Sequence, residues 1–228
     1  RGDGLPGSRD HEKAGAVMAG PIMSWLDERT GLRQFREAKK RQAVPSHMGF
    51  LYCFGGISLF IILLQVLTGL FMVFYYEPTP QEALRSIERM SNQVPLGWLL
   101  RNMQRTGARL LLASPFSHMI SVGFQRAYSR PRELNWLSGV LQFVVVFLLL
   151  ATGLLLPWDW RAYWSFAIWM DYVGTWPLIG TALQGFLLDS FTINRGFVIH
   201  VLVLPLLLLI LLRFHFGMVR RHGISEPL

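Results

Sequence analysis

Cysteine is nearly absent from this chain, and acidic residues are few. The 228 residues contain one cysteine, Cys53, so no internal disulfide can form and a disulfide-stapled domain is excluded. There are 22 Lys and Arg against 14 Asp and Glu, and hydrophobic residues make up 52% of the chain. Residues 1–42 are polar and show no apolar run of the kind found in a signal peptide. This composition excludes an ordinary soluble domain and favours a membrane protein.

Four apolar segments have the length of a transmembrane helix, which needs about 20 residues. They are residues 48–76, 98–124, 134–157 and 195–219. The first and third contain no Asp, Glu, Lys or Arg, and the second is apolar from Leu110 onward. We therefore predict an all-α fold, a polytopic membrane protein in which residues 43–228 form a four-helix transmembrane bundle.

The polar N-terminal extension, residues 1–42, contains one amphipathic stretch. Between Ile22 and Arg41, apolar side chains alternate with charges, which predicts a helix lying on the membrane surface. Basic residues gather before the first span, between the second and third spans, and after the fourth. The positive-inside rule then places both termini on the cytoplasmic or stromal side of a bacterial inner or thylakoid-type membrane. The basic excess thus reflects topology, and we expect a lipid membrane rather than nucleic acid as partner.

Three histidines lie inside the predicted spans, where a polar ring needs a partner. His200 and His215 are 15 residues apart, which on a regular helix separates them by about 22 Å and turns them by about 60°. His118 lies on another span, and a site with two metal centres would need a fourth ligand about 14 residues before it, where Gln104 stands. Imidazole suits iron, and paired histidines suit electron transfer through haem.

Glycines repeat the same interval. Gly55 and Gly69 are 14 residues apart on the first span, and Gly139 and Gly153 are 14 apart on the third. Glycine lets a flat macrocycle approach the backbone, although small residues also serve plain helix packing in membranes.

Three arginines follow one helical stripe at the outer end of the second span. They are Arg101, Arg105 and Arg109, spaced four residues apart. Charges at this depth need partners, and haem propionates would pair with Arg101 and Arg105. For Arg109, snorkelling to the interface explains the position equally well.

Short segments along the chain resemble cytochrome b6, the short, split form of cytochrome b. They are Val-Pro-Ser-His at 44–47, Tyr-Cys-Phe-Gly-Gly at 52–56, Gly-Trp-Leu-Leu-Arg at 97–101, Arg-Pro-Arg-Glu-Leu at 130–134, Pro-Trp-Asp at 157–159, His200 with Pro205, and Gly-Ile-Ser-Glu-Pro-Leu at 223–228. The likeness covers about residues 22–228 in order. The chain ends after the fourth span as the split form does, so a companion subunit is expected to carry the C-terminal half of cytochrome b.

The resemblance implies a role for each candidate residue. His118 and His215 match the ligands of the inner haem b, and His200 matches one ligand of the outer haem b. Cys53 matches a cysteine that binds an extra haem c through one thioether, whereas without the resemblance it would be a small buried hydrophobe. Arg220 matches a basic residue beside that haem, on the side where quinone is reduced.

Gln104 departs from the family, because it occupies the position of the second outer ligand and a carboxamide is a poor ligand for haem iron beside imidazole. A five-coordinate haem on His200, a haem bound by another group, and no outer haem are the three alternatives. Pro115, three residues before His118, would also kink its helix. The leading hypothesis is the haem-bearing subunit of a quinol oxidoreductase with a Rieske-type iron–sulfur protein or c-type cytochrome as partner, in a dimeric complex. A non-bifurcating quinone-linked relay and a membrane anchor subunit are the alternatives.

Overall fold

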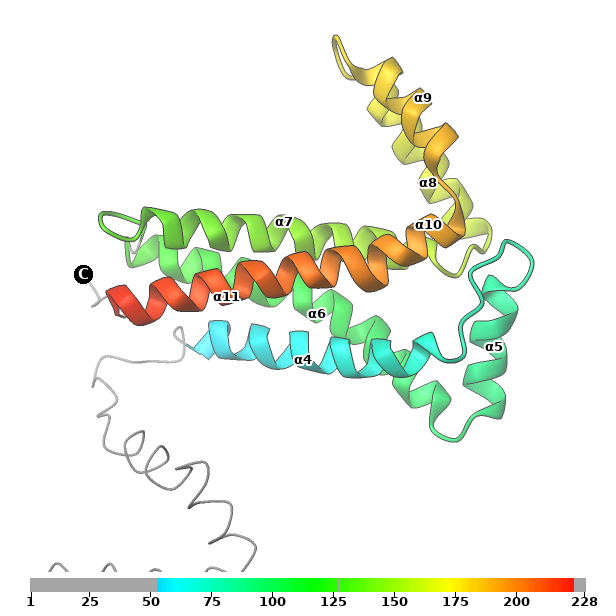
Figure 1. Ribbon diagram of the computed structural model, residues 1–228, viewed down its shortest axis with the longest axis horizontal. Coiled ribbons are helices and arrows are strands. Elements are labelled where there is room, and N and C mark those ends of the chain that lie inside the picture. Colours follow the sequence, from blue (N-terminus) through cyan, green and yellow to red (C-terminus); the bar gives the residue numbers. More distant parts are fainter. Residues whose placement is uncertain (1–52, 127, 224–228) are drawn as a thin grey trace, which may run out of the picture. The chain divides into compact units, whose positions relative to one another are not determined.

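Every element of the described chain is helical. The computed structural model describes residues 53–126 and 128–223, all within the compact unit Gly49–Leu228. The elements in Figure 1 are α4 (Phe54–Val73), α5 (Ala83–Gln93), α6 (Gly97–Phe124), α7 (Glu133–Leu155), α8 (Trp160–Gly174), α9 (Gly180–Ser190), α10 (Ile193–Val198), the π-helical turn η2 (Ile199–Val203) and α11 (Leu204–His222). The all-α prediction is confirmed for these residues. The predicted surface helix between Ile22 and Arg41 lies outside them.

Three helical stretches are long and apolar enough to cross a membrane. They are Phe54–Val73, Glu133–Leu155 and Ile193–His222, the last formed by α10, η2 and α11 together. In the most apolar 18-residue stretch of each helix, only 22%, 17% and 17% of the stretch is buried within the molecule. Most of their apolar side chains therefore face outward, as helices in contact with lipid do, and the chain is an integral membrane protein. α6 has 28 residues, enough to span a bilayer, but its first turns carry the three arginines.

The long helices α4, α6, α7 and α11 run side by side and share one apolar core (Figure 1). α4 packs mainly on α6, α11 packs on α7, and α6 contacts α7. Each of the four helices contributes to the central cluster. Its buried members are Ile61, Ile62, Leu111, Val145, Val146, Leu204, Leu208 and Leu212. The cluster therefore joins the two helix pairs at the middle of the bundle.

The predicted fourth span is not a regular helix. Pro205 has no N–H, and its ring collides with the carbonyl of the residue four before it in a regular α-helix. The structure accommodates this with the π-helical turn η2, which ends two residues before Pro205. By contrast, α6 continues as one helix through Pro115.

Residues 158–194, which separate the third and fourth predicted spans, contain two helices that were not predicted from the sequence. α8 begins after Asp159, whose Oδ1 accepts a hydrogen bond from the Ala162 N–H at 2.8 Å, an N-cap. α9 packs beside α8, and the two project together to the side of the long helices from one end of the bundle (Figure 1). The Pro-Trp-Asp segment at 157–159 therefore serves to end α7 and start α8.

Two other family-like segments also have structural roles. A side chain at Gly97 would collide with the carbonyl oxygen of Met90, so the turn from α5 into α6 requires glycine there. Arg132 Nη2 donates a hydrogen bond to the carbonyl oxygen of His222 at 3.2 Å, which ties the start of α7 to the end of α11.

Candidate functional site

Both candidate ligands on α6 lie against a glycine of α4. A Cβ atom added at Gly55 would lie 3.2 Å from Cε1 of His118, closer than side chains normally pack. A Cβ atom added at Gly69 would lie 3.4 Å from the side-chain amide of Gln104. A side chain at Gly55 would therefore press on the imidazole even with no larger group between them, and Gly69 lets the carboxamide lie close to the backbone of α4.

The same arrangement occurs between α11 and α7. A Cβ atom added at Gly153 would lie 2.8 Å from Cε1 of His200, a distance that real side chains do not adopt. At Gly139 the added atom would lie 3.7 Å from Cε1 of His215, an ordinary contact. All four glycines singled out in the sequence thus contact the four candidate ligand positions, one each.

The four pairs form two levels separated by the packed core. His118 and His215 lie within electrostatic range of each other. Leu111, in the core cluster, is seven residues from both Gln104 and His118, or about 10 Å along the helix in each direction. Val146 is likewise midway between the two glycines of α7. The apolar layer therefore closes the centre of the bundle and leaves one set of candidate ligands on each side.

The π-helical turn compensates for the extra residue between the two histidines of the last span, which are 15 residues apart rather than 14. A π-helical turn accommodates one more residue than an α-helical turn. The 15 residues from His200 to His215 include η2, so they advance about as far as 14 residues of a regular helix. This matches the interval from Gln104 to His118, and the 60° rotation calculated for a regular helix does not apply.

A hydroxyl group orients the imidazole of His215. Ser138, directly before Gly139, donates its only proton to the carbonyl oxygen of Asn135 at 2.7 Å. Its oxygen lies 2.8 Å from Nδ1 of His215 and must therefore accept that N–H. The neutral ring then carries its lone pair on Nε2, the atom available to a metal.

His200 is held in the same way by Thr152, the residue directly before Gly153. The Thr152 hydroxyl is 2.7 Å from the carbonyl oxygen of Leu148, to which it donates, and 2.9 Å from Nδ1 of His200. Nε2 of His200 is again the free nitrogen. The sequence analysis did not identify either hydroxyl residue, although the recurrence of Ser or Thr before these glycines was a usable signal.

The two positions on α6 differ from each other. Thr68, directly before Gly69 and 3% exposed, places its hydroxyl against the carboxamide of Gln104. Phe54 precedes Gly55 instead, and within the described residues the buried Nδ1 of His118 has no hydrogen-bond partner. Three of the four candidate ligands therefore have a hydroxyl partner on the neighbouring helix, and Gln104 is one of them.

The remaining predicted residues lie at the two ends of the bundle. Cys53 is exposed at the N-cap of α4, two residues before Gly55, so it is not a small buried hydrophobe. Arg220 is exposed in the last turn of α11. At the opposite end Arg101 is half-buried, and Arg105 is exposed.

Arg101 has acidic neighbours in the protein itself. Glu88 and Asp159 lie within electrostatic range of its guanidinium, as does Arg105. Part of the positive charge of Arg101 is therefore balanced by acidic groups of the chain itself. Arg105 is exposed, so its side chain is the freer of the two to pair with a haem propionate.

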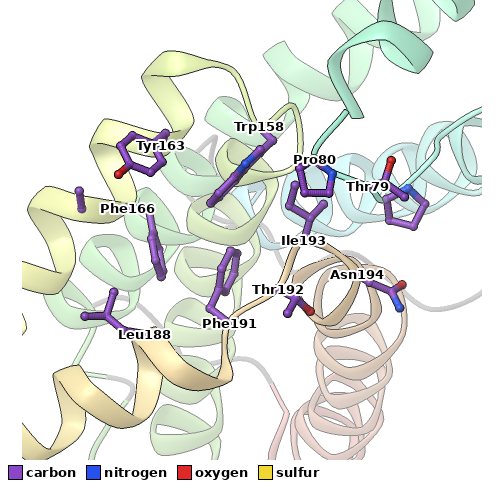
Figure 2. A pocket seen from close by; sticks show the side chains of 12 residues that line it. Thr79, Pro80, Trp158, Tyr163, Phe166, Leu188, Phe191, Thr192, Ile193 and Asn194 are labelled. Atoms are coloured by element: carbon purple, nitrogen blue, oxygen red, sulfur yellow. The ribbon is translucent and has the colours of Figure 1, made fainter. Parts of the chain in front are cut away.

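An apolar pocket of about 500 Å³ opens at the end of the bundle that carries Gly153 and His200. Figure 2 shows Trp158, Tyr163 and Phe166 from one side of the wall and Phe191 to Asn194 from the other. The rings of Trp158 and Phe191 stack at 5.7 Å between centroids. Its size and aromatic lining are typical of a pocket for an organic ligand with a few polar contacts. This pocket was not predicted from the sequence, because its lining residues come from separate segments of the chain.

The donor set fits haem. Within the described residues no three His, Cys, Asp or Glu side chains cluster as ligands for a metal ion. What the bundle offers instead is pairs of axial donors at two levels, with glycine facing each donor where a macrocycle needs backbone clearance. Imidazoles with a free Nε2, held by a hydrogen bond at Nδ1, are the usual axial ligands of such a group.

Comparison with known proteins shows which family this chain resembles. The family model described as Cytochrome b/b6/petB matches residues 39–223. The chain is 38% identical over 224 residues to the menaquinol:cytochrome c reductase cytochrome b subunit of Bacillus subtilis (strain 168), covering 92% of this chain and 100% of the relative. It is 36% identical over 213 residues to cytochrome b6 of Heliobacterium modesticaldum (strain ATCC 51547 / Ice1), covering 90% and 100%.

A solved structure of a hyperthermophilic respiratory Complex III has the same fold. The TM-score is 0.82 at 31% sequence identity, over 90% of this chain. The matched region is 56% of that longer chain. The family match, the curated relatives and the shared fold agree with the resemblance read from the sequence, and this chain belongs to the cytochrome b/b6 family.

Proposed function

We propose that this protein is the haem-bearing membrane subunit of a quinol oxidoreductase and carries electrons between quinone sites on the two sides of a membrane. In this proposal quinol is oxidised near the outer face, losing two electrons and two protons. One electron passes to a Rieske-type iron–sulfur protein or c-type cytochrome, and the other crosses the bundle to reduce quinone at the inner face. The protein's part is to hold the redox groups in position, while the cofactors supply the electron chemistry.

The observation that carries this proposal is the set of four contacts between candidate ligands and glycines at two levels. His118 and His215 are the proposed ligands of an inner haem b, with Gly55 and Gly139 giving it clearance. His200 and the position of Gln104 define the outer site, with Gly69 and Gly153. The 14 residues between the levels on α6 correspond to about 21 Å along the helix, so one bundle links the two sides of a bilayer about 30 Å thick.

The proposal includes α6 as a fourth membrane span, with both termini on the inner side. Its length supports this, and so does the position of Arg101, Arg105 and Arg109 in its first turns, where long basic side chains reach the interface. The arrangement also keeps Arg220, in the last turn of α11, on the inner side with the other basic groups.

A covalent haem c on Cys53 and a quinone are the further cofactors we propose. The exposure of Cys53 beside the inner level supports the first. The aromatic pocket beside Trp158 supports a quinol site at the outer end (Figure 2), completed by the companion subunit that carries the second half of cytochrome b. A dimeric complex is the expected assembly.

One observation favours a second candidate function. Gln104 replaces an imidazole at the outer level, and a weaker axial donor stabilises ferric iron less. The outer haem would then have a raised potential, and the protein would be a non-bifurcating quinone-linked relay. A membrane anchor with no outer haem is the limiting case.

A haem inventory of the purified complex tests these alternatives. Pyridine haemochrome analysis should give two b haems and one c haem per chain, and haem staining after denaturing electrophoresis should mark this subunit. A reduced-minus-oxidised titration then distinguishes a low outer potential, as bifurcation requires, from a raised one. One b haem indicates the anchor, and no b haem refutes the proposal.

A further inference from the structure

The hydroxyl of Thr68 contacts more hydrogen-bond acceptors than it can satisfy. Its Oγ1 is 2.8 Å from the carbonyl oxygen of Leu64 and 3.4 Å from that of Gln65. It also lies against the Gln104 side-chain oxygen Oε1. A threonine hydroxyl carries one proton, so with the amide in this orientation at least one close pair of oxygens shares no hydrogen.

The other two hydroxyl residues show how such a group is satisfied. Ser138 and Thr152 each donate to a carbonyl oxygen of their own helix and accept an N–H from the facing histidine. Thr68 has the same helix position, directly before a glycine, and the same short distance to its own backbone. Its facing side chain should therefore also be a donor, and the only donor that Gln104 offers is its Nε2 amide group.

Turning the Gln104 amide by half a turn about its last torsion meets this requirement. Oxygen and nitrogen exchange places in a side-chain amide with almost no change in shape. Nε2 then donates to Thr68, and Thr68 donates to Leu64. Oε1 takes the place now occupied by Nε2, at 3.4 Å from where a Cβ of Gly69 would lie. Within the described residues the Nε2 end of the amide makes no hydrogen bond to protein, since the bonds at Gln104 are those of its backbone oxygen and of Oε1.

We propose that Gln104 is an axial haem ligand through Oε1, together with Nε2 of His200, and that Thr68 is the positioning residue that turns the oxygen toward the site. This rests on the proposed function, because it assumes an outer haem. Among the two amide atoms only oxygen has a free lone pair, since that of nitrogen is delocalised into the carbonyl. A carboxamide oxygen is a hard, weak-field donor, so the outer haem is six-coordinate and high-spin in its ferric form, unlike the inner one.

Spectroscopy of the purified complex tests this assignment. Resonance Raman and electron paramagnetic resonance report coordination number and spin state, and pulsed resonance methods count axial nitrogens. The wild type should show one six-coordinate, high-spin b haem with a single axial nitrogen. Gln104→Leu should make it five-coordinate. Gln104→His should make it low-spin with two axial nitrogens, because Thr68 can accept the Nδ1–H of the new ring as Thr152 does for His200.

Variants of Thr68 separate positioning from ligation. Thr68→Val keeps the shape and removes the hydroxyl, so the amide is free to rotate and a five-coordinate fraction should appear. Cyanide should then bind about fivefold more tightly, the change expected for loss of one neutral hydrogen bond. Thr68→Ser should restore the wild-type spectrum. Thr175→Val makes the same substitution at an exposed hydroxyl bonded to the Tyr172 carbonyl, so it is the control for the change of residue type and should leave the haem spectrum unchanged.

Three results would overturn the proposal. A five-coordinate outer haem in the wild type would show that Gln104 is not a ligand, and two axial nitrogens would show that another residue is. A Thr68→Val spectrum identical to the wild type would remove the positioning role. If only one b haem is present, both this proposal and the outer site of the proposed function fail, whereas a second b haem with the wrong ligation refutes the ligand assignment alone.

Discussion

Ser138→Ala is the substitution that most directly tests how the inner level is built. Ser138 is 2% exposed, and its oxygen is the acceptor for the Nδ1–H of His215 at 2.8 Å. Alanine removes this acceptor with little change in volume. The ring then loses the contact that fixes which nitrogen is free, while all groups proposed to bind haem remain in place.

The expected effect is large enough to measure. A buried N–H without a partner costs about 1–3 kcal/mol, and removing the hydrogen-bond partner of a metal-bound imidazole typically weakens metal binding about 10–100-fold. The lost bond also makes the ring a poorer donor to ferric iron. The inner haem potential should rise by up to about 60 mV, the shift produced by a tenfold change in ferric against ferrous preference.

Ser86→Ala is a matched control. Ser86 is 1% exposed, donates to the carbonyl oxygen of Ala83 at 2.9 Å and accepts the N–H of Glu77 at 3.1 Å. It is therefore buried to a similar degree and, like Ser138, donates one hydrogen bond and accepts one, but its donor partner is a backbone N–H rather than a histidine. Removing the Ser86 hydroxyl should lower the free energy of unfolding by a similar amount without changing haem binding or the haem potential.

The two variants are compared by haem transfer to excess apomyoglobin, by redox titration and by thermal unfolding in detergent. We expect both to unfold at lower temperature, and only Ser138→Ala to release haem faster and shift the potential. Equal haem loss in the two variants would show that general destabilisation is responsible. No haem effect in Ser138→Ala would refute the assigned role of the hydrogen bond.

Further outcomes are expected for two single substitutions and for one pair of glycine variants. His118→Ala should remove the inner haem b while leaving the outer one, measured as loss of one b haem in pyridine haemochrome analysis; retention of both would refute the ligand assignment. Cys53→Ser should abolish haem staining of the denatured subunit without changing b-haem content, and a native subunit that does not stain would refute covalent attachment. Gly153→Ala should displace the His200 ring, because the added Cβ would lie 2.8 Å from it, and overpacking of this kind costs about 1–3 kcal/mol. Gly139→Ala meets the facing ring only at 3.7 Å, so in haem-free protein it should be neutral or stabilising by up to about 1 kcal/mol, and equal thermal destabilisation of the two would contradict this reading.

The resemblance read from the sequence was sufficient to identify the family. The ordered short segments identified cytochrome b6, and the family match confirms that reading. The roles of the individual ligands remain predictions. The helices α8 and α9 were missed because residues 158–194 were read as one loop, although the Asp159 cap is a local signal three residues from its donor. The stacking of Trp158 on Phe191, by contrast, forms only when residues far apart in the sequence meet.

The amino-acid sequence determined the long helices of the bundle and the axial order of the candidate ligands along them. A run of apolar residues long enough for a bilayer allows little besides a helix, and residues 14 apart on one helix necessarily lie at two levels. The tertiary structure decided which residue each ligand faces. Pairing of α4 with α6 and α7 with α11 depends on side chains far apart in the chain, and it brings Gly153 to His200 and Thr68 to Gln104. It also decided the π turn before Pro205, whose extra residue brings a 15-residue interval into step with the 14-residue intervals of the other helices. The alignment of one helix against the next is set by packing between helices, because the atoms that a side chain must contact belong to a different helix.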